Sequence, residues 1–272
     1  FMLHVSVFAE LHSFATKRIK ERKNKRLPSQ DDLNPNLRFV DNELLKAISN
    51  SSSIQKKIEE YKISWFSHED VIQKLYKAIE ESNAYKKYMS VDGFDVEDQK
   101  SFIIKIYREF IADNDILQDF FEERSIHWSD DHYFVCGYIV KYLKGFQARF
   151  SEDYRVPDLY KDVDDDVDFI QTLYRKTLVN SSVYQEIIMD KAKNWDADRI
   201  AVIDFIFMKM ALCELVNIPS VPIKVTLNEY IELSKTYSTP KSRVFINGIL
   251  DKIVPDLKQK GEIKKIGRGL MN

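Results

Sequence analysis

The sequence predicts an all-α protein built from helical bundles. Only 7 glycines and 7 prolines occur in 272 residues, while charged residues make up 31% of the chain. Apolar residues recur at spacings of three and four, which is the period of a helix with one buried face. This composition favours helices with solvated outer faces over a sheet protein.

Length and charge restrict the class of protein. A chain of this length forms one large domain or two small ones. The net charge of −2 gives no global attraction to nucleic acid or anionic lipid, so any RNA contact must come from a local basic patch. No apolar run approaches the ~18 residues of a membrane span, and no signal peptide is visible. We therefore expect a cytoplasmic protein, with Cys136 and Cys213 reduced and buried among apolar neighbours.

Residues 1–160 are predicted to form an extended helical N-terminal part. A helix over 1–26 opens it and ends in a basic run that includes Arg22 and Lys23. That run is consistent with a solvated helix end, where cations are favoured by the helix dipole, or with a nucleic-acid surface. A loop follows at 27–36. Further helices are expected at 41–49, 52–63, 69–81, 97–112, 114–124 and 131–149. Trp65 and Phe66, in a short connection, are expected to pack as a hydrophobic plug.

The segment 151–168 is predicted to be a linker. It contains five aspartates between 162 and 168, and clustered carboxylates can hold Ca²⁺ or Mg²⁺. Because the cluster lacks a glycine turn and a distal glutamate, we expect instead the acidic first turn of a helix at 167–179, with no metal. Ser182 can cap the helix that follows.

Trp195 to Asp251 is predicted to contain three helices joined by two tight connections. Their expected start signals are Asp196 as the first cap, a Thr226–Glu229 capping box, and Thr239–Pro240. Asn247–Gly248 alone would indicate a turn, but the apolar spacing around it favours helix, with Gly248 allowing a neighbouring helix to approach closely. The basic tail, 260–272, is expected to be frayed.

This C-terminal stretch resembles the NusB family of transcription antitermination factors over about 90 residues. The resemblance covers 161–259 and is carried by Asp198-Arg199, Asp204, the run Ala211-Leu-Cys-Glu214-Leu, Ile218-Pro with Val225, Asn228-Glu-Tyr-Ile-Glu-Leu-Ser-Lys235 and Phe245-Ile-Asn-Gly-Ile-Leu-Asp251. It implies an all-α fold and pairing with the ribosomal protein NusE. It also implies joint binding of boxA-type RNA in rRNA transcription, with other antitermination factors and RNA polymerase contacted indirectly.

The resemblance also implies site residues. By motif position, the partner-binding face falls on Asp204, Tyr237 and Phe245, although Phe245 also fits a core stripe with Ile249. The cationic candidates for RNA contact are Arg22, Lys23, Arg199, Lys209 and Arg243.

The chain departs from the family pattern in two places. Lys241 stands where family members often carry an acidic residue. The family's RNA contacts depend on an arginine-rich segment that opens its first helix, and nothing in residues 1–16 matches it. We expect this segment to lie upstream of Phe1, in an extended member of the type found in the Bacteroidetes.

No catalytic constellation is recognisable. None of His68, His127 and His132 falls in a metal-binding or catalytic spacing, so we expect surface histidines, no cofactor and no enzymatic activity. Two alternatives stay open beside an antitermination factor. One is a regulatory NusB-like domain of an rRNA-modifying enzyme, and the other is a helical scaffold that does not bind RNA.

Overall fold

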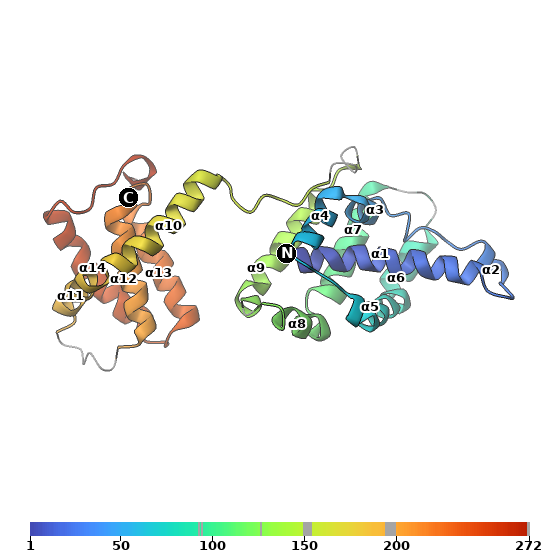
Figure 1. Cartoon of the computed structure of the whole chain (residues 1–272), viewed down its shortest axis with the longest axis horizontal. Helices are drawn as coiled ribbons and strands as arrows, with labels where there is room; N and C mark the ends of the chain where they lie inside the picture. Colours follow the sequence, from blue (N-terminus) through green and yellow to red (C-terminus); the bar gives the residue numbers. More distant parts are fainter. Residues whose placement is uncertain (92, 94, 126, 149–153, 194–199, 271–272) are drawn as a thin grey trace. The chain divides into compact units, whose positions relative to one another are not determined.

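The computed structural model describes residues 1–272 except 92, 94, 126, 149–153, 194–199 and 271–272. Every regular element that it describes is helical, so the predicted all-α fold class is confirmed. The chain divides into two compact units, Phe1–Pro157 and Asp158–Asn272, here called unit 1 and unit 2 (Figure 1).

Unit 1 is organised around its first helix, which packs against α3 and α5. The helices of this unit are α1 (Met2–Lys23), α2 (Gln30–Leu33), α3 (Glu43–Asn50), α4 (Ser52–Glu60), α5 (Glu69–Glu81), α6 (Asn83–Ser90), α7 (Val96–Ile106), α8 (Asp115–Glu122) and α9 (Trp128–Lys144). A 3-10 turn at Phe66–His68 precedes α5, and a π-helical segment at Tyr107–Ile111 continues α7.

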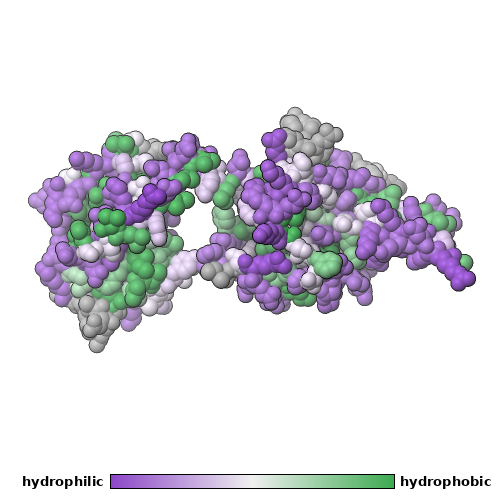
Figure 2. All heavy atoms as spheres, in the orientation of Figure 1, coloured by the Kyte–Doolittle hydropathy of each residue, from purple (hydrophilic) through white to green (hydrophobic). Residues whose placement is uncertain are grey.

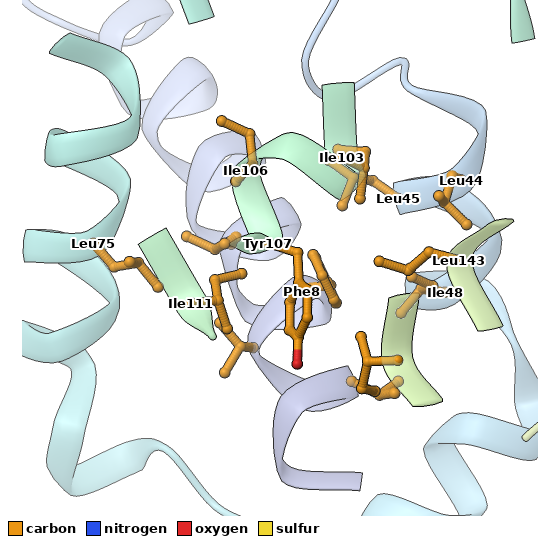
Figure 3. Close-up of a cluster of buried hydrophobic side chains, with 14 of the residues drawn as sticks. Phe8, Leu44, Leu45, Ile48, Leu75, Ile103, Ile106, Tyr107, Ile111 and Leu143 are labelled. Atoms are coloured by element: carbon orange, nitrogen blue, oxygen red, sulfur yellow. The ribbon is translucent and has the colours of Figure 1, made fainter. Parts of the chain in front are cut away.

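The core of unit 1 brings α1, α3, α5, α7 and α9 together. In Figure 3, Phe8 and Tyr107 lie between aliphatic side chains contributed by the other helices, and both rings are fully buried. The Tyr107 hydroxyl lies 3.0 Å from Nδ1 of the buried His4. This hydrogen bond satisfies a phenol group that would otherwise be costly to bury.

Unit 2 is a bundle in which α12 contacts the other four long helices. These are α10 (Val163–Val179), α11 (Ser181–Lys191), α12 (Val202–Asn217), α13 (Ile223–Tyr237) and α14 (Ser242–Gln259), with a 3-10 turn at Gly267–Leu270. Because α12 is apolar on most sides, Phe207, Met208 and the run Ala211–Leu215 are all buried. Figure 2 shows hydrophobic residues reaching the surface of each unit between hydrophilic ones.

Two predicted helix starts were wrong. α13 begins at Ile223 after Pro222, so Thr226 lies inside the helix, where its buried hydroxyl donates back to the Pro222 carbonyl at 3.4 Å. Pro222 is the N-cap residue and has an extended backbone, so the helix starts at Ile223, before the Thr226–Glu229 capping box. α14 begins at Ser242, after Thr239–Pro240. The predicted cap at Asp196 lies outside the described residues.

Three further predictions needed correction. The helix through Asn247–Gly248 is confirmed, but a Cβ added at Gly248 would meet nothing within 4 Å, so no helix approaches closely there. Trp65 is buried and stacks on Phe120, whereas Phe66 is 84% exposed and does not plug the connection.

The third correction concerns short helices and their caps. α2 lies within the predicted loop at 27–36, and α6 was not predicted. α11 begins at Ser181 after Asn180, which places Ser182 in its first turn with no capping hydrogen bond from Asn180.

The aspartate-rich segment forms the acidic first turn of a helix, as predicted, but α10 begins at Val163, four residues before the predicted start and within the predicted linker. Asp162 accepts hydrogen bonds from the backbone N–H groups of Asp164 and Asp165, and the Asp166 carboxylate accepts from that of Lys161. These carboxylates satisfy the free N–H groups of the helix start and complement its dipole.

The basic tail is docked onto unit 2 at Lys265 and Ile266, so the predicted fraying was wrong at these two positions. Lys265 Nζ donates to the backbone carbonyls of Ile218 at 2.9 Å and Glu214 at 3.3 Å, and Ile266 N–H donates to Pro219. The tail thereby adds a second donor to two carbonyls at the C-terminal end of α12, which already accept the backbone N–H groups of Ile218 and Val221.

Candidate partner-binding and RNA-binding sites

The three predicted partner-binding residues lie at one end of unit 2. Asp204 is in the first turn of α12, Tyr237 ends α13, and Phe245 is in the first turn of α14. α13 packs against both α12 and α14. The connection between α13 and α14 is short, since α13 ends at Tyr237 and α14 begins at Ser242.

Asp204 is buried, with 4% of its surface exposed, and it has a partner inside unit 2. Its Oδ1 accepts a hydrogen bond from Ser238 Oγ at 2.6 Å. The Ser238 hydroxyl also lies 2.9 Å from Ser242 Oγ, which is 2.8 Å from Thr239 Oγ1. This hydrogen bond satisfies a buried carboxylate on an apolar helix and links the start of α12 to the connection between α13 and α14.

The hydroxyl groups of Ser238, Thr239 and Ser242 were not predicted as part of the site. The only sequence signal for them is the concentration of small hydroxyl residues in Ser-Thr-Pro-Lys-Ser, between two apolar periodic segments. Such residues favour helix ends because their side chains can bond to nearby polar groups.

The two predicted aromatic contacts differ in exposure. Tyr237 is 47% exposed, and its ring centroid lies 6.5 Å from that of the buried Phe207. Phe245 is 7% exposed and belongs to the apolar core of unit 2. Its neighbour Val244 is 68% exposed. Tyr237 and Val244 are therefore accessible apolar side chains at this end, whereas Phe207 and Phe245 are buried.

In unit 1, the basic end of α1 is partly neutralised by acidic residues. Arg22 Nε lies 2.6 Å from Asp32 Oδ1, Lys25 lies 3.2 Å from the same carboxylate, and Arg18 pairs with Glu80. The hydrogen bond from Arg22 holds the pKa of the Asp32 carboxyl well below its usual range. Lys23 is exposed.

The remaining cationic candidates belong to unit 2. Lys209 donates to Ser181 Oγ and Gln185 Oε1, both at 2.9 Å, and so links α12 to α11. Arg243 is exposed near the start of α14, and Arg199 lies outside the described residues. Arg22 and Lys23 thus lie in unit 1, while Lys209 and Arg243 lie on different helices of unit 2.

The histidines in unit 1 are more buried than the sequence suggested. The His132 side chain is only 13% exposed, and its Nδ1 lies 3.6 Å from Cys136 Sγ, so the prediction of a surface histidine was wrong at this position. Cys136 is half-buried and Cys213 buried, both as free thiols. No group of three metal-ligating side chains converges within the described ranges. No helix among them is both long and apolar enough to cross a bilayer.

The fold and this end of unit 2 define an all-α protein with a C-terminal five-helix bundle. The NusB family model matches residues 145–255. The chain is 45% identical over 104 residues to the transcription antitermination protein NusB of Salinibacter ruber, covering 38% of this chain and 65% of the relative. It is 41% identical over 105 residues to NusB of Chloroherpeton thalassium, covering 39% and 50%. It is 33% identical over 116 residues to NusB of Listeria monocytogenes, covering 42% and 89%. No solved structure matches the chain.

The chain therefore belongs to the NusB family, because the match includes nearly the whole length of one relative. It spans about two thirds and one half of the other two relatives. Residues 1–144, which form nearly all of unit 1, lie before the matched region.

Proposed function

We propose that this protein is a transcription antitermination factor that pairs with the ribosomal protein NusE and, with it, binds boxA-type RNA. The observation that carries the proposal is the end of unit 2 at which half-exposed Tyr237 lies beside the buried Asp204–Ser238 hydrogen bond. The proposal is supported by the family resemblance, which implies a partner-binding face at these positions. An exposed aromatic side chain on a fixed backbone is a common anchor of protein interfaces.

Each residue has a distinct role in this proposal. Tyr237 supplies contact area to the partner. Asp204 acts through Ser238 to position the connection between α13 and α14, since its carboxylate is buried and already bonded. Phe245 supports the surface from below. Asp204 and Phe245 are thus positioning residues for a contact made by Tyr237 and its exposed neighbours.

The test of partner binding is isothermal titration calorimetry with purified NusE. Tyr237→Ala should weaken binding by about 1–3 kcal/mol, the usual cost of losing an aromatic anchor. Tyr174→Ala is the matched control, because Tyr174 is an exposed tyrosine on α10 of the same unit. Equal effects of the two changes, or none from Tyr237→Ala, would exclude this face.

A second pair of variants tests the positioning role of Asp204. If Asp204 acts through the connection, Ser238→Ala should weaken NusE binding about as much as Asp204→Asn. If Asp204 contacts NusE directly, Ser238→Ala should have the smaller effect. Circular dichroism should show helix content unchanged in both variants.

RNA binding is proposed to need the partner, since the net charge of −2 provides no general attraction. The affinity of the pair for boxA-type RNA should fall as salt rises, because each phosphate contact releases counterions. Lys23→Glu and Arg243→Glu should reduce the slope of this salt dependence by roughly one unit each. Arg22→Glu should reduce it less than Lys23→Glu, because Asp32 already neutralises Arg22. An unchanged slope in all three variants would show that none of these residues contacts the RNA phosphates.

A further inference from the structure

The outer face of α9 carries large apolar side chains that unit 1 does not cover. Tyr133 is 83% exposed and Phe134 is 74% exposed. The start of α1 covers a different flank of α9, where Phe1 packs edge-on against Tyr138 and Tyr142 at 5.6 and 5.2 Å. We call the uncovered face the α9 seam; its exposed residues are Asp130, Tyr133, Phe134, Gly137, Lys141 and Lys144.

The spacing along the seam is that of a helix that packs on another helix. Asp130, Phe134, Gly137, Lys141 and Lys144 follow one another at intervals of four, three, four and three residues. This alternation keeps successive side chains on one narrow stripe of a helix.

Gly137 lies at the centre of the seam, in the interior of a 17-residue helix. Glycine lowers helix stability there, and a Cβ at this position would meet nothing within 4 Å inside the chain. The folding of unit 1 therefore gives no steric reason for glycine at 137. A backbone without a side chain does, however, let a second helix approach closely.

The charges on the seam are placed symmetrically about Gly137. Asp130 lies seven residues before it and Lys144 seven residues after it, each two turns or about 10.5 Å along the axis. Neither residue, nor Lys141, has an ion-pair partner within the described parts of the chain. A helix with the opposite direction and the same sequence would place its Lys144 beside Asp130 and its Asp130 beside Lys144.

We propose that two copies of this protein associate through antiparallel α9 seams about a two-fold axis at Gly137. This inference concerns unit 1 and is independent of the proposed function of unit 2. A two-fold interface uses the same surface on both copies, so it must be complementary to itself, as this charge pattern is. The register also brings Tyr133 and Phe134 of each copy near Lys141 of the other, where the ammonium group can lie over an aromatic ring.

The charge pattern favours a second copy over RNA. Asp130 and Asp131, both exposed at the N-terminal end of α9, would repel phosphates that Lys141 and Lys144 attract. A single helix pair also makes a small interface, at the low end of the range for specific association. The dimer should therefore dissociate on dilution.

The experiment is sedimentation velocity of the full chain over a dilution series, with thermal unfolding of each variant. The wild-type chain should pass reversibly from dimer to monomer. Gly137→Gln should unfold at the same or a higher temperature, because the monomer has space for the side chain and gains a better helix former. The same change should weaken dimerisation at least about tenfold, as should Phe134→Ala. Phe66→Ala, which removes an even more exposed phenylalanine ring elsewhere in unit 1, should leave dimerisation unchanged.

Charge exchange tests the antiparallel register. Lys144→Glu should weaken the dimer, because it faces Asp130 of the other copy, and adding Asp130→Lys in the same chain should restore it. A chain that stays monomeric at every concentration, as it would if unit 2 covered the seam, overturns the proposal. The proposal is also overturned if Gly137→Gln leaves dimerisation unchanged, or if the Asp130→Lys/Lys144→Glu double variant does not regain dimerisation. It is likewise overturned if Phe134→Ala weakens RNA binding and leaves dimerisation unchanged.

Discussion

At the scale of single residues, the most unusual environment is that of His4. Its side chain is fully buried between Tyr107, Phe121 and Trp128. Burial, with a smaller contribution from His132, lowers the pKa of His4 to about 3. The ring is therefore neutral in the folded protein at every pH near neutrality, and the Tyr107 hydroxyl fixes its orientation.

This pKa predicts that unit 1 loses stability in mild acid. In the unfolded chain His4 binds a proton below about pH 6.5, while in the folded protein it stays neutral down to about pH 3. The free energy of unfolding should therefore decrease as the pH is lowered below 6.5. The slope should approach about 1.4 kcal/mol per pH unit, because the unfolded state binds one more proton than the folded state. His4→Gln should reduce this slope between pH 6.5 and 5, in urea unfolding followed by tryptophan fluorescence. The matched control is His127→Gln, at an exposed position, which should keep the wild-type slope.

At the scale of helices, periodicity was a reliable guide and end signals were not. The apolar spacing predicted all the long helices, and the helix through Asn247–Gly248, because burial of several large side chains outweighs the cost of one glycine. α6 was missed because Asn-Ala-Tyr-Lys-Lys-Tyr-Met-Ser buries only Tyr88 and has no extended stripe. The Thr226–Glu229 pattern failed because the helix already begins at Ile223, directly after the extended Pro222.

The C-terminal end of α12 gives a prediction at this scale. Lys265 donates to two carbonyls there, and burial lowers the pKa of its ammonium group. Lys265→Met keeps the apolar stem and removes the donors, so it should destabilise unit 2 by about 1 kcal/mol. Lys264→Met, one residue earlier and exposed, is the control. Equal melting temperatures for the two variants would show that the contact contributes nothing.

At the scale of the whole molecule, the chain forms two compact units, and the sequence predicted more about unit 2 than about unit 1. The resemblance covered unit 2 because its motifs recur in order. It could not show that Asp204 is satisfied internally, since the Ser238 hydroxyl that bonds to it lies 34 residues away. For unit 1 there was no motif to follow, and neither the burial of His132 nor the exposure of Phe66 was foreseen.

The connection between the units predicts a site of limited proteolysis. Tyr154 is anchored in unit 1, where its ring stacks on Tyr142 at 4.6 Å and its hydroxyl donates to the Tyr142 carbonyl. A few residues later Leu159 is 85% exposed. Brief treatment with chymotrypsin should cut near Leu159 and Tyr160, and both fragments should keep helical circular dichroism after separation. A fragment that loses its helices would show that the units depend on each other for folding.

The docking of Lys265 onto α12 has a consequence for the order of events during synthesis. The lysine lies 51 residues after Glu214, whose carbonyl it binds. Domains fold as units from the N-terminal end as the chain emerges. Unit 1 can therefore be complete while unit 2 is still being translated, whereas α12 receives its last hydrogen bonds only when the tail has left the ribosome. A released chain that ends shortly before Lys265 would thus have a finished unit 1 and a unit 2 in which the C-terminal end of α12 lacks the two Lys265 hydrogen bonds.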